Sequence, residues 1–241
     1  MPVTNPQSGT RIDEIAAGIF RISTPVPPNP EVPGGFTFNQ FLVVDDEPLL
    51  FHTGMRAIFP LVREAVATVM PVAKLRWVSF SHVEGDESGA LEQWLAEAPD
   101  ATPLVGSIGA MLSDATRPPR RLADGETLAI GQKKVRWFDA PHLPHGWDSG
   151  FLMETTTKTL FCGDLFTQPG AEHPPVTDGD ILGPSEAMRA AMDYYASPKT
   201  AALQIEKLAA AEPTLLACMH GASYRGDGAA LLRALGKALA K

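Results

Sequence analysis

The chain has 241 residues, of which 44% are hydrophobic and 20% are charged, and this composition can bury one substantial core. Its 28 Asp and Glu residues outnumber its 20 Lys and Arg residues, for a formal net charge of −8, which argues against binding to nucleic acid or anionic membranes. No apolar stretch approaches the roughly 20 residues of a membrane-spanning helix, residues 1–11 lack the apolar region of a signal peptide, and two cysteines cannot form a disulfide framework. We therefore expect a cytoplasmic enzyme with one domain, residues 1–241.

The first half of the chain alternates predicted strands with turns and helices. A segment rich in proline and glycine, residues 24–35, is expected to be a surface loop. Pro60 marks the first turn of a helix, where proline is favoured. The expected strands are residues 15–23, 36–44, 48–52, 75–81 and 104–106, and the expected helices are residues 60–69, 89–98 and 108–113.

The second half of the chain contains a series of predicted hairpins followed by helices around one further strand. The expected strands are residues 122–130, 134–140, 150–155, 159–162 and 215–219, and the expected helices are residues 186–196, 200–210 and 228–240. Strands joined partly by hairpins and partly by helical crossovers predict a layered α/β domain with mixed sheets. In such sheets ligands gather where strands end.

Histidines recur where predicted strands end. His82, His142, His145 and His220 each follow an apolar run, and Asp164 follows another run in the same manner. A lone histidine is more often structural, but repeated placement beside carboxylates favours a metal site. Neutral imidazole and ionised carboxylate are ordinary ligands of transition metals.

The densest group of such side chains lies in residues 81–89. Alternate residues of an extended chain project to the same side, so His82 and Glu84 could bind one ion. Asp86 or Glu87 could then reach a neighbouring ion. The alternative is an acidic loop that only stabilises the N-terminus of the following helix.

This segment, HVEGDESGAL at residues 82–91, is similar to the H-x-E-x-D-H-S-G-S-L signature of flavodiiron proteins, which belong to the metallo-β-lactamase superfamily. Five further segments resemble that family in the same order along the chain: FTFNQFLVVDDE at 36–47, HGWDS at 145–149, CGDLF at 162–166, YYA at 194–196 and HGASYR at 220–225. The resemblance implies an α/β fold, the metallo-β-lactamase-like αββα sandwich, with two mixed sheets between helical layers. It also implies a centre of two non-haem iron ions.

Carried over position by position, the resemblance implies a ligand set for each iron. The first iron would be held by His82, Glu84 and His145, and the second by Asp86 and His220, with Asp164 as the bridge. Glu84 stands where many hydrolases of the superfamily have a histidine. An oxygen-richer ligand set moves the metal preference from zinc toward iron or manganese.

The sequence departs from the family's pattern at three places. Glu87 replaces a histidine, and we interpret it as a ligand or water-mediated contact of the second iron, with helix capping as the alternative. His145 is preferred to His142 as a ligand because the following Asp148 keeps the family's offset. His52 replaces an aspartate of the first hairpin and is interpreted as a supporting residue rather than a ligand.

No flavodoxin-like region or glycine-rich phosphate loop follows the last helix, so we expect no FMN on this chain and a separate electron-donor protein. The leading hypothesis is an oxidoreductase that binds and reduces O2 or NO between two irons. The alternatives are a dinuclear zinc hydrolase of an ester, thioester or lactone, and a non-catalytic O2 or redox sensor. No nucleic-acid or membrane partner is expected, and a homodimer is compatible with the sequence.

Overall fold

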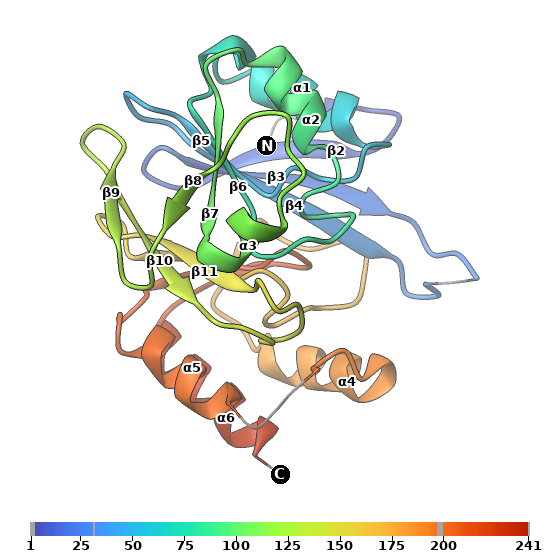
Figure 1. Cartoon of the computed structure of the whole chain (residues 1–241). Coiled ribbons are helices and arrows are strands. Elements are labelled where there is room, and N and C mark those ends of the chain that lie inside the picture. Colours follow the sequence, from blue (N-terminus) through green and yellow to red (C-terminus); the bar gives the residue numbers. More distant parts are fainter. Residues whose placement is uncertain (1–2, 31, 197–199, 241) are drawn as a thin grey trace.

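Two mixed β-sheets pack face to face in the computed structural model, which describes residues 3–30, 32–196 and 200–240. Two helices, α1 (Phe59–Ala67) and α2 (Leu91–Glu97), cover the outer face of the first sheet. The outer face of the second sheet packs against α5 (Ala201–Ala209) and α6 (Gly228–Leu239) (Figure 1). The predicted αββα sandwich is confirmed.

The first sheet has eight strands that lie side by side in chain order. Its first five strands pair antiparallel, whereas its last four pair parallel. Parallel neighbours require crossover connections, and here α1, α2 and α3 (Ser107–Leu112) lie in the three crossovers. The strands are β1 (Val3–Asn5), β2 (Thr10–Ala16), β3 (Ile19–Val26), β4 (Phe36–Val43), β5 (Leu49–Phe51), β6 (Trp77–Ser79), β7 (Thr102–Gly106) and β8 (Arg120–Leu122).

The second sheet has seven strands in the order β13-β15-β14-β12-β11-β10-β9. Its hairpin-linked strands β9 to β12 pair antiparallel, and β14 then joins parallel to β12 after α4 (Leu182–Met192) and α5. The strands are β9 (Thr127–Ala129), β10 (Lys134–Asp139), β11 (Gly150–Glu154), β12 (Thr159–Phe161), β13 (Val176–Thr177), β14 (Leu215–Ala217) and β15 (Ser223–Arg225).

The core lies in three apolar layers. Trp94 fills the layer under α1 and α2, and Trp77 and Trp137 lie between the two sheets, as expected from their sequence context. Cys162 and Cys218 are buried in the layer under α5 and α6. Truncating a buried tryptophan to alanine in such a layer costs about 3–5 kcal/mol.

Three predicted elements differ clearly from the structure. The strand expected at 15–23 spans a hairpin, because the chain turns at Gly18, with φ +69°, between β2 and β3. The strand expected at 122–130 is split, because a turn with Gly125 at φ +78° carries the chain from β8 in one sheet to β9 in the other. The loop expected at 24–35 begins later, because Pro25 continues β3 opposite Thr37. Short strands such as β1, β13 and β15 carry too little periodicity to be predicted.

The segment YYA at 194–196, expected on a helix, follows α4 instead. Asp193 adopts φ +48°, a left-handed conformation that ends the helix. Within the described ranges, no helix is both long and apolar enough to cross a membrane.

Candidate metal centre

Loops that follow four strands meet at one edge of the sandwich. The loop after β6 carries His82, Glu84 and Asp86, and those after β10, β12 and β14 carry His145, Asp164 and His220 respectively. In the second sheet β10, β12 and β14 run in the same direction, so their carboxyl ends share that edge. The structure therefore brings together six of the seven side chains proposed as ligands.

Four of these side chains form the first cluster. Nε2 of His82 lies 2.7 Å from Oε2 of Glu84, and Nε2 of His145 lies 2.9 Å from the same oxygen. Oδ2 of Asp164 lies 3.6 Å from His82 Nε2 and 3.3 Å from His145 Nε2. One ligand atom from each residue lies within 4.8 Å of the others, a spacing that fits one metal ion.

The second cluster shares Asp164 with the first. Nε2 of His220 lies 3.3 Å from Oδ1 of Asp164 and 3.4 Å from Oδ2 of Asp86. Asp164 thus turns one carboxylate oxygen to each cluster. This is the arrangement that a carboxylate bridging two ions requires.

All three imidazoles in these clusters have Nδ1 engaged on the side away from the carboxylates of the clusters. His145 Nδ1 donates to the carbonyl oxygen of Tyr194 at 2.9 Å, and His220 Nδ1 donates to that of Thr37 at 2.8 Å. His82 Nδ1 lies 3.1 Å from the Ser81 hydroxyl oxygen. A proton held on Nδ1 leaves the lone pair on Nε2, which is the nitrogen that faces each cluster.

The crowded carboxylates change the proton affinity of these groups. Burial disfavours imidazolium, but the charge of Glu87 and hydrogen bonds to Glu84 and Glu87 raise the pKa of His82 to about 12. Burial also lowers the pKa of His220, but hydrogen bonds to Asp164 and Asp86 and the charges of these two groups raise it to about 10. Hydrogen bonds from His145 and His82 lower the pKa of Glu84 to about 2. So much negative charge attracts cations, and metal ions must compete with protons for these nitrogens.

Residues of β3 and β4 support the His220 loop through hydrogen bonds. The hydroxyl oxygen of Thr37 accepts from Gly221 N at 2.8 Å, and Asn39 Nδ2 donates to the carbonyl oxygens of Cys218 and Gly221 at 2.9 Å. Nη2 of the buried Arg21 donates to the same Gly221 oxygen at 2.8 Å. The resemblance at 36–47 drew attention to this hairpin but did not reveal its role in supporting the loop.

Glu87 lies outside both clusters, in a place that neither sequence interpretation anticipated. Its Oε2 accepts hydrogen bonds from the Ser81 hydroxyl, from Ser81 N at 3.2 Å and from His82 N at 2.9 Å. Within the described ranges its side chain is not paired with Asp86 or His220, and the N-cap of α2 has no side-chain hydrogen bond. Hydrogen bonds from the backbone N–H groups of Ser81 and His82 hold this carboxylate away from the second cluster.

The two remaining site histidines are clearly separated by the structure. His142 is exposed, and its backbone N–H closes a turn onto Gly146 O at 2.8 Å, which leaves His145 as the imidazole of the first cluster. His52 is fully buried, with its Nε2 3.5 Å from Oε1 of Glu87. Neither ring lies within the clusters.

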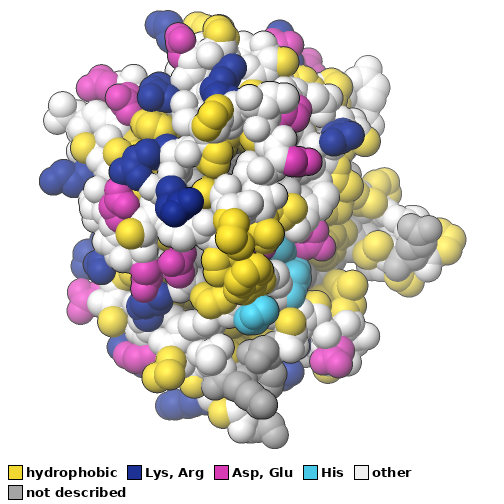
Figure 2. Space-filling model, in the orientation of Figure 1, with side chains coloured by type: hydrophobic (Ala, Val, Ile, Leu, Met, Phe, Trp, Pro, Cys, Tyr) yellow, Lys and Arg dark blue, Asp and Glu magenta, His cyan; other side chains and the backbone are white. Residues whose placement is uncertain are grey.

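A small cavity of about 190 Å³ opens onto the clusters. Its non-ligand wall is formed by Phe36, Thr167, Met188, Met192 and Tyr194. The ring of Phe36 stacks on His220 with centroids 4.2 Å apart. Figure 2 shows histidine side chains at the surface beside a group of hydrophobic side chains.

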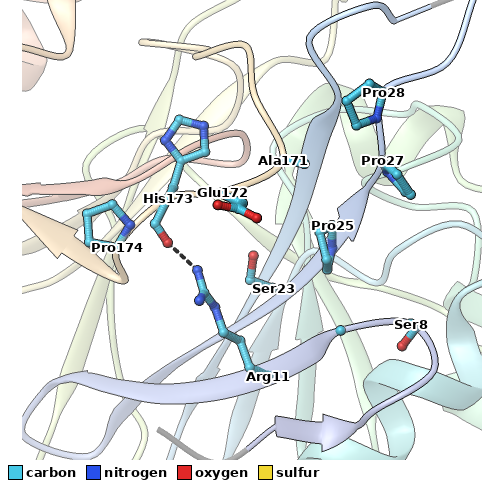
Figure 3. A pocket seen from close by; sticks show the side chains of 11 residues that line it. Ser8, Arg11, Ser23, Pro25, Pro27, Pro28, Ala171, Glu172, His173 and Pro174 are labelled. Carbon is cyan, nitrogen blue, oxygen red and sulfur yellow. Dashed lines mark hydrogen bonds between the residues drawn. The ribbon is translucent and has the colours of Figure 1, made fainter.

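A second pocket, of about 600 Å³, lies apart from the metal ligands (Figure 3). It is formed by β2, β3, the proline-rich segment after β3 and the chain around His173. Arg11 projects into it and donates to the carbonyl oxygen of His173. None of the residues that line this pocket belongs to the two clusters.

Comparison with known proteins identifies a family for this chain. Residues 36–221 match the family model described as ODP family beta lactamase. The chain is 26% identical over 208 residues to the rubredoxin-oxygen oxidoreductase of Megalodesulfovibrio gigas, covering 80% of this chain and 50% of that protein. It is 27% identical over 216 residues to the nitric oxide reductase of Moorella thermoacetica, covering 83% of this chain and 52% of that protein. The chain therefore spans about half the length of these curated relatives.

Among solved structures, the chain superimposes on a mutant of the flavo di-iron protein from Thermotoga maritima with a TM-score of 0.81 and 18% identity. The match covers 95% of this chain and 62% of that one. The rubredoxin oxygen:oxidoreductase from Desulfovibrio gigas gives a TM-score of 0.80 at 22% identity, with the same coverage. At these identities the matches establish the fold.

Proposed function

Because the chain belongs to the ODP family of beta-lactamase domains, we propose that it holds two iron ions and uses them to bind and reduce O2 or NO with electrons from a separate donor protein. The observation that carries this proposal is Asp164, which turns one oxygen toward His145 and the other toward His220, each at 3.3 Å. A carboxylate shared between two ligand clusters is suited to bridge two ions.

The donor set favours iron. The first ion would be held by His82, Glu84, His145 and Asp164, and the second by Asp86, His220 and the other oxygen of Asp164. Equal numbers of imidazoles and carboxylates form an oxygen-rich set, which suits iron or manganese better than a thiolate-rich or purely imidazole set would. Two irons held there would pass on the donor's electrons and offer open coordination positions for a diatomic ligand.

The cavity supports a very small substrate. Its volume of about 190 Å³ lies below the roughly 300–1,000 Å³ of pockets that enclose drug-sized ligands. Phe36, Met188 and Tyr194 give it a largely apolar wall, which limits the entry of water and of charged molecules.

The surface around the ligands suits contact with a donor. Val83 and Trp147, which flank Glu84 and His145 in the chain, are 53% and 51% exposed. Aromatic and other apolar side chains are the ones that a partner protein buries at the core of an interface. An electron-transfer protein that docks there would place its redox group near the first cluster.

The test is to purify the chain anaerobically, load it with ferrous iron and measure consumption of O2 and of NO with a reduced rubredoxin as donor. We expect turnover of at least one gas that depends on both iron and donor. D164N should lose it, whereas D178N, at an exposed carboxylate outside the site, should retain it. Hydrolysis of a thioester or lactone by a zinc-loaded chain that reduces neither gas would overturn the proposal. Gas binding without turnover would point to the sensor.

A further inference from the structure

A buried acid–imidazole pair lies behind the first cluster. Glu87 and His52 are both fully buried, and His52 Nε2 lies 3.5 Å from Glu87 Oε1. Among the described residues, neither ring nitrogen of His52 nor Oε1 of Glu87 makes a hydrogen bond, so the 3.5 Å approach between them is an ion-pair contact. Buried polar atoms are almost always paired, and Oε1 of Glu87 is the acceptor that lies within reach of His52 Nε2.

The other oxygen of Glu87 is turned to His82. Oε2 lies 3.2 Å from His82 Nδ1, and the Ser81 hydroxyl, which donates to this oxygen, lies 3.1 Å from the same nitrogen. Nδ1 of His82 therefore meets Glu87 both directly and through Ser81. On the far side of the ring, Nε2 faces Glu84 and Asp164.

This environment distinguishes His82 from the other two imidazoles. His145 and His220 direct Nδ1 to neutral backbone carbonyls, those of Tyr194 and Thr37. Of these three rings, His82 alone directs Nδ1 to a carboxylate. A charged acceptor holds the imidazole orientation and tautomer more firmly and makes Nε2 a stronger metal donor.

The backbone of His52 fixes the direction of its ring. His52 has φ +66°, a left-handed conformation uncommon for a residue with a Cβ. Its backbone N–H is fixed to Ser79 O at 2.8 Å, and its ring packs against Phe51 with centroids 4.4 Å apart. Such a conformation persists where the surroundings fix it, and here it turns the ring toward Glu87.

We propose that His52 and Glu87 form a positioning pair for the metal ligand His82. His52 donates its Nε2 proton toward Oε1 of Glu87, while Oε2 of Glu87 holds the Nδ1 proton of His82. Nε2 of His82 is thereby presented, unprotonated, to the first ion whenever that ion is bound. Glu87 is then not a ligand of the second ion, which keeps only Asp86, His220 and Asp164 as protein ligands.

The inference rests on the proposed function only in taking His82 as a metal ligand, so zinc alone can serve as the probe without O2, NO or a donor. Zinc affinity is measured for the full chain and for E87Q, H52L, H52Q and the double variant E87Q/H52L. We expect E87Q to weaken binding of the first zinc by about 10–100-fold without changing the number of ions bound. E92Q, an exposed carboxylate on α2, is the matched control and should bind zinc like the unmodified chain.

The His52 variants test whether the two residues act together. H52L should weaken zinc binding, H52Q should restore most of it because its amide can donate to Glu87, and E87Q/H52L should be no weaker than E87Q alone. In the zinc-loaded chain, nitrogen NMR should show His82 protonated at Nδ1 with a proton that exchanges slowly, and E87Q should shift that signal and speed its exchange.

Three results would overturn the inference: loss of one zinc per chain in E87Q, strictly additive effects of E87Q and H52L, or a lower melting temperature with unchanged zinc affinity and unchanged His82 signals. A chain that passes these tests but reduces neither O2 nor NO would retain the positioning pair and lose the proposed function. A chain that reduces a gas but fails these tests would keep the proposed function and lose the positioning pair.

Discussion

The carbonyl oxygen of Tyr194 accepts a hydrogen bond from Nδ1 of His145, 49 residues earlier in the chain, at 2.9 Å. Ala196 N reinforces the contact by donating to Pro144 O at 2.7 Å. The segment that follows α4 therefore orients a metal ligand with backbone atoms, and it also supplies Tyr194 to the wall of the cavity.

The two histidines of the 142–146 turn should behave differently when replaced. H145N removes an imidazole from the first cluster and should weaken binding of one ion by at least about tenfold. H142N changes an exposed side chain at φ +67°, a conformation that asparagine tolerates, and should leave metal content unchanged. Metal analysis after dialysis against a weak chelator measures both variants side by side. Equal metal loss in the two variants would contradict the assignment of His145.

Metal affinity should rise with pH. A bound ion must displace protons from Nε2 of His82 and His220, whose pKa values are raised to about 12 and about 10 in the metal-free protein. Apparent affinity should therefore increase steadily between about pH 6 and pH 9, with protons released on binding. Calorimetry in buffers of different ionisation enthalpy counts those protons. Affinity that is independent of pH across this range would show that the imidazoles are not the ligands.

The stability of the metal-free protein should also depend on pH, because the same groups have shifted pKa values in the folded state. The raised pKa values of His82 and His220 mean that their stabilising contribution is complete below the ordinary imidazole pKa of about 6.5 and is lost as pH rises toward 10 and beyond. Glu84 acts in the opposite sense, because its lowered pKa gives a contribution that is lost as pH falls from about 4.5 toward 2. The melting temperature without metal should thus fall as pH rises above about 6.5, and bound metal should remove that fall. A melting temperature that rises across this range would contradict these assignments.

Replacing Thr37 should weaken binding of the second ion but not of the first. T37V keeps the shape of the side chain but leaves the buried N–H of Gly221 without its acceptor, at a cost of about 1–3 kcal/mol. We expect a lower melting temperature and weaker binding of the second ion, with the first ion unaffected. T24V removes a buried hydroxyl that contacts Thr10 rather than the His220 loop and is the matched control. Equal metal binding in T37V and T24V would show that the loop does not depend on Thr37.

Local sequence pattern, together with the family resemblance that separated His145 from His142, was enough to find the side chains that gather at the sheet edge. His82, His145, Asp164 and His220 each follow a strand, and strand ends converge in any sandwich of this kind. The supporting contacts could not be found in the same way. Thr37 and Tyr194 orient their histidines through backbone carbonyls, which have no signature in the sequence, and they reach those histidines only through tertiary packing.

Glu87 shows that the role of a residue cannot always be predicted from its neighbours in the sequence. Its place among acidic residues just before α2 fits a ligand or a helix cap equally well. The choice depends on His52, which a strand of the same sheet brings beneath the loop, and on the N–H groups of Ser81 and His82. Similarly, the split between β8 and β9 depends on the turn at Gly125, which interrupts an otherwise continuous alternation.

The central claim is that Asp164 joins two iron ions, and Mössbauer spectroscopy of the chain loaded anaerobically with iron-57 tests it most directly. We predict two irons per chain whose spectra show magnetic coupling in the oxidised protein, and loss of that coupling in D164N. A single iron per chain, or two irons that behave as isolated high-spin ions, would contradict the shared carboxylate between His145 and His220.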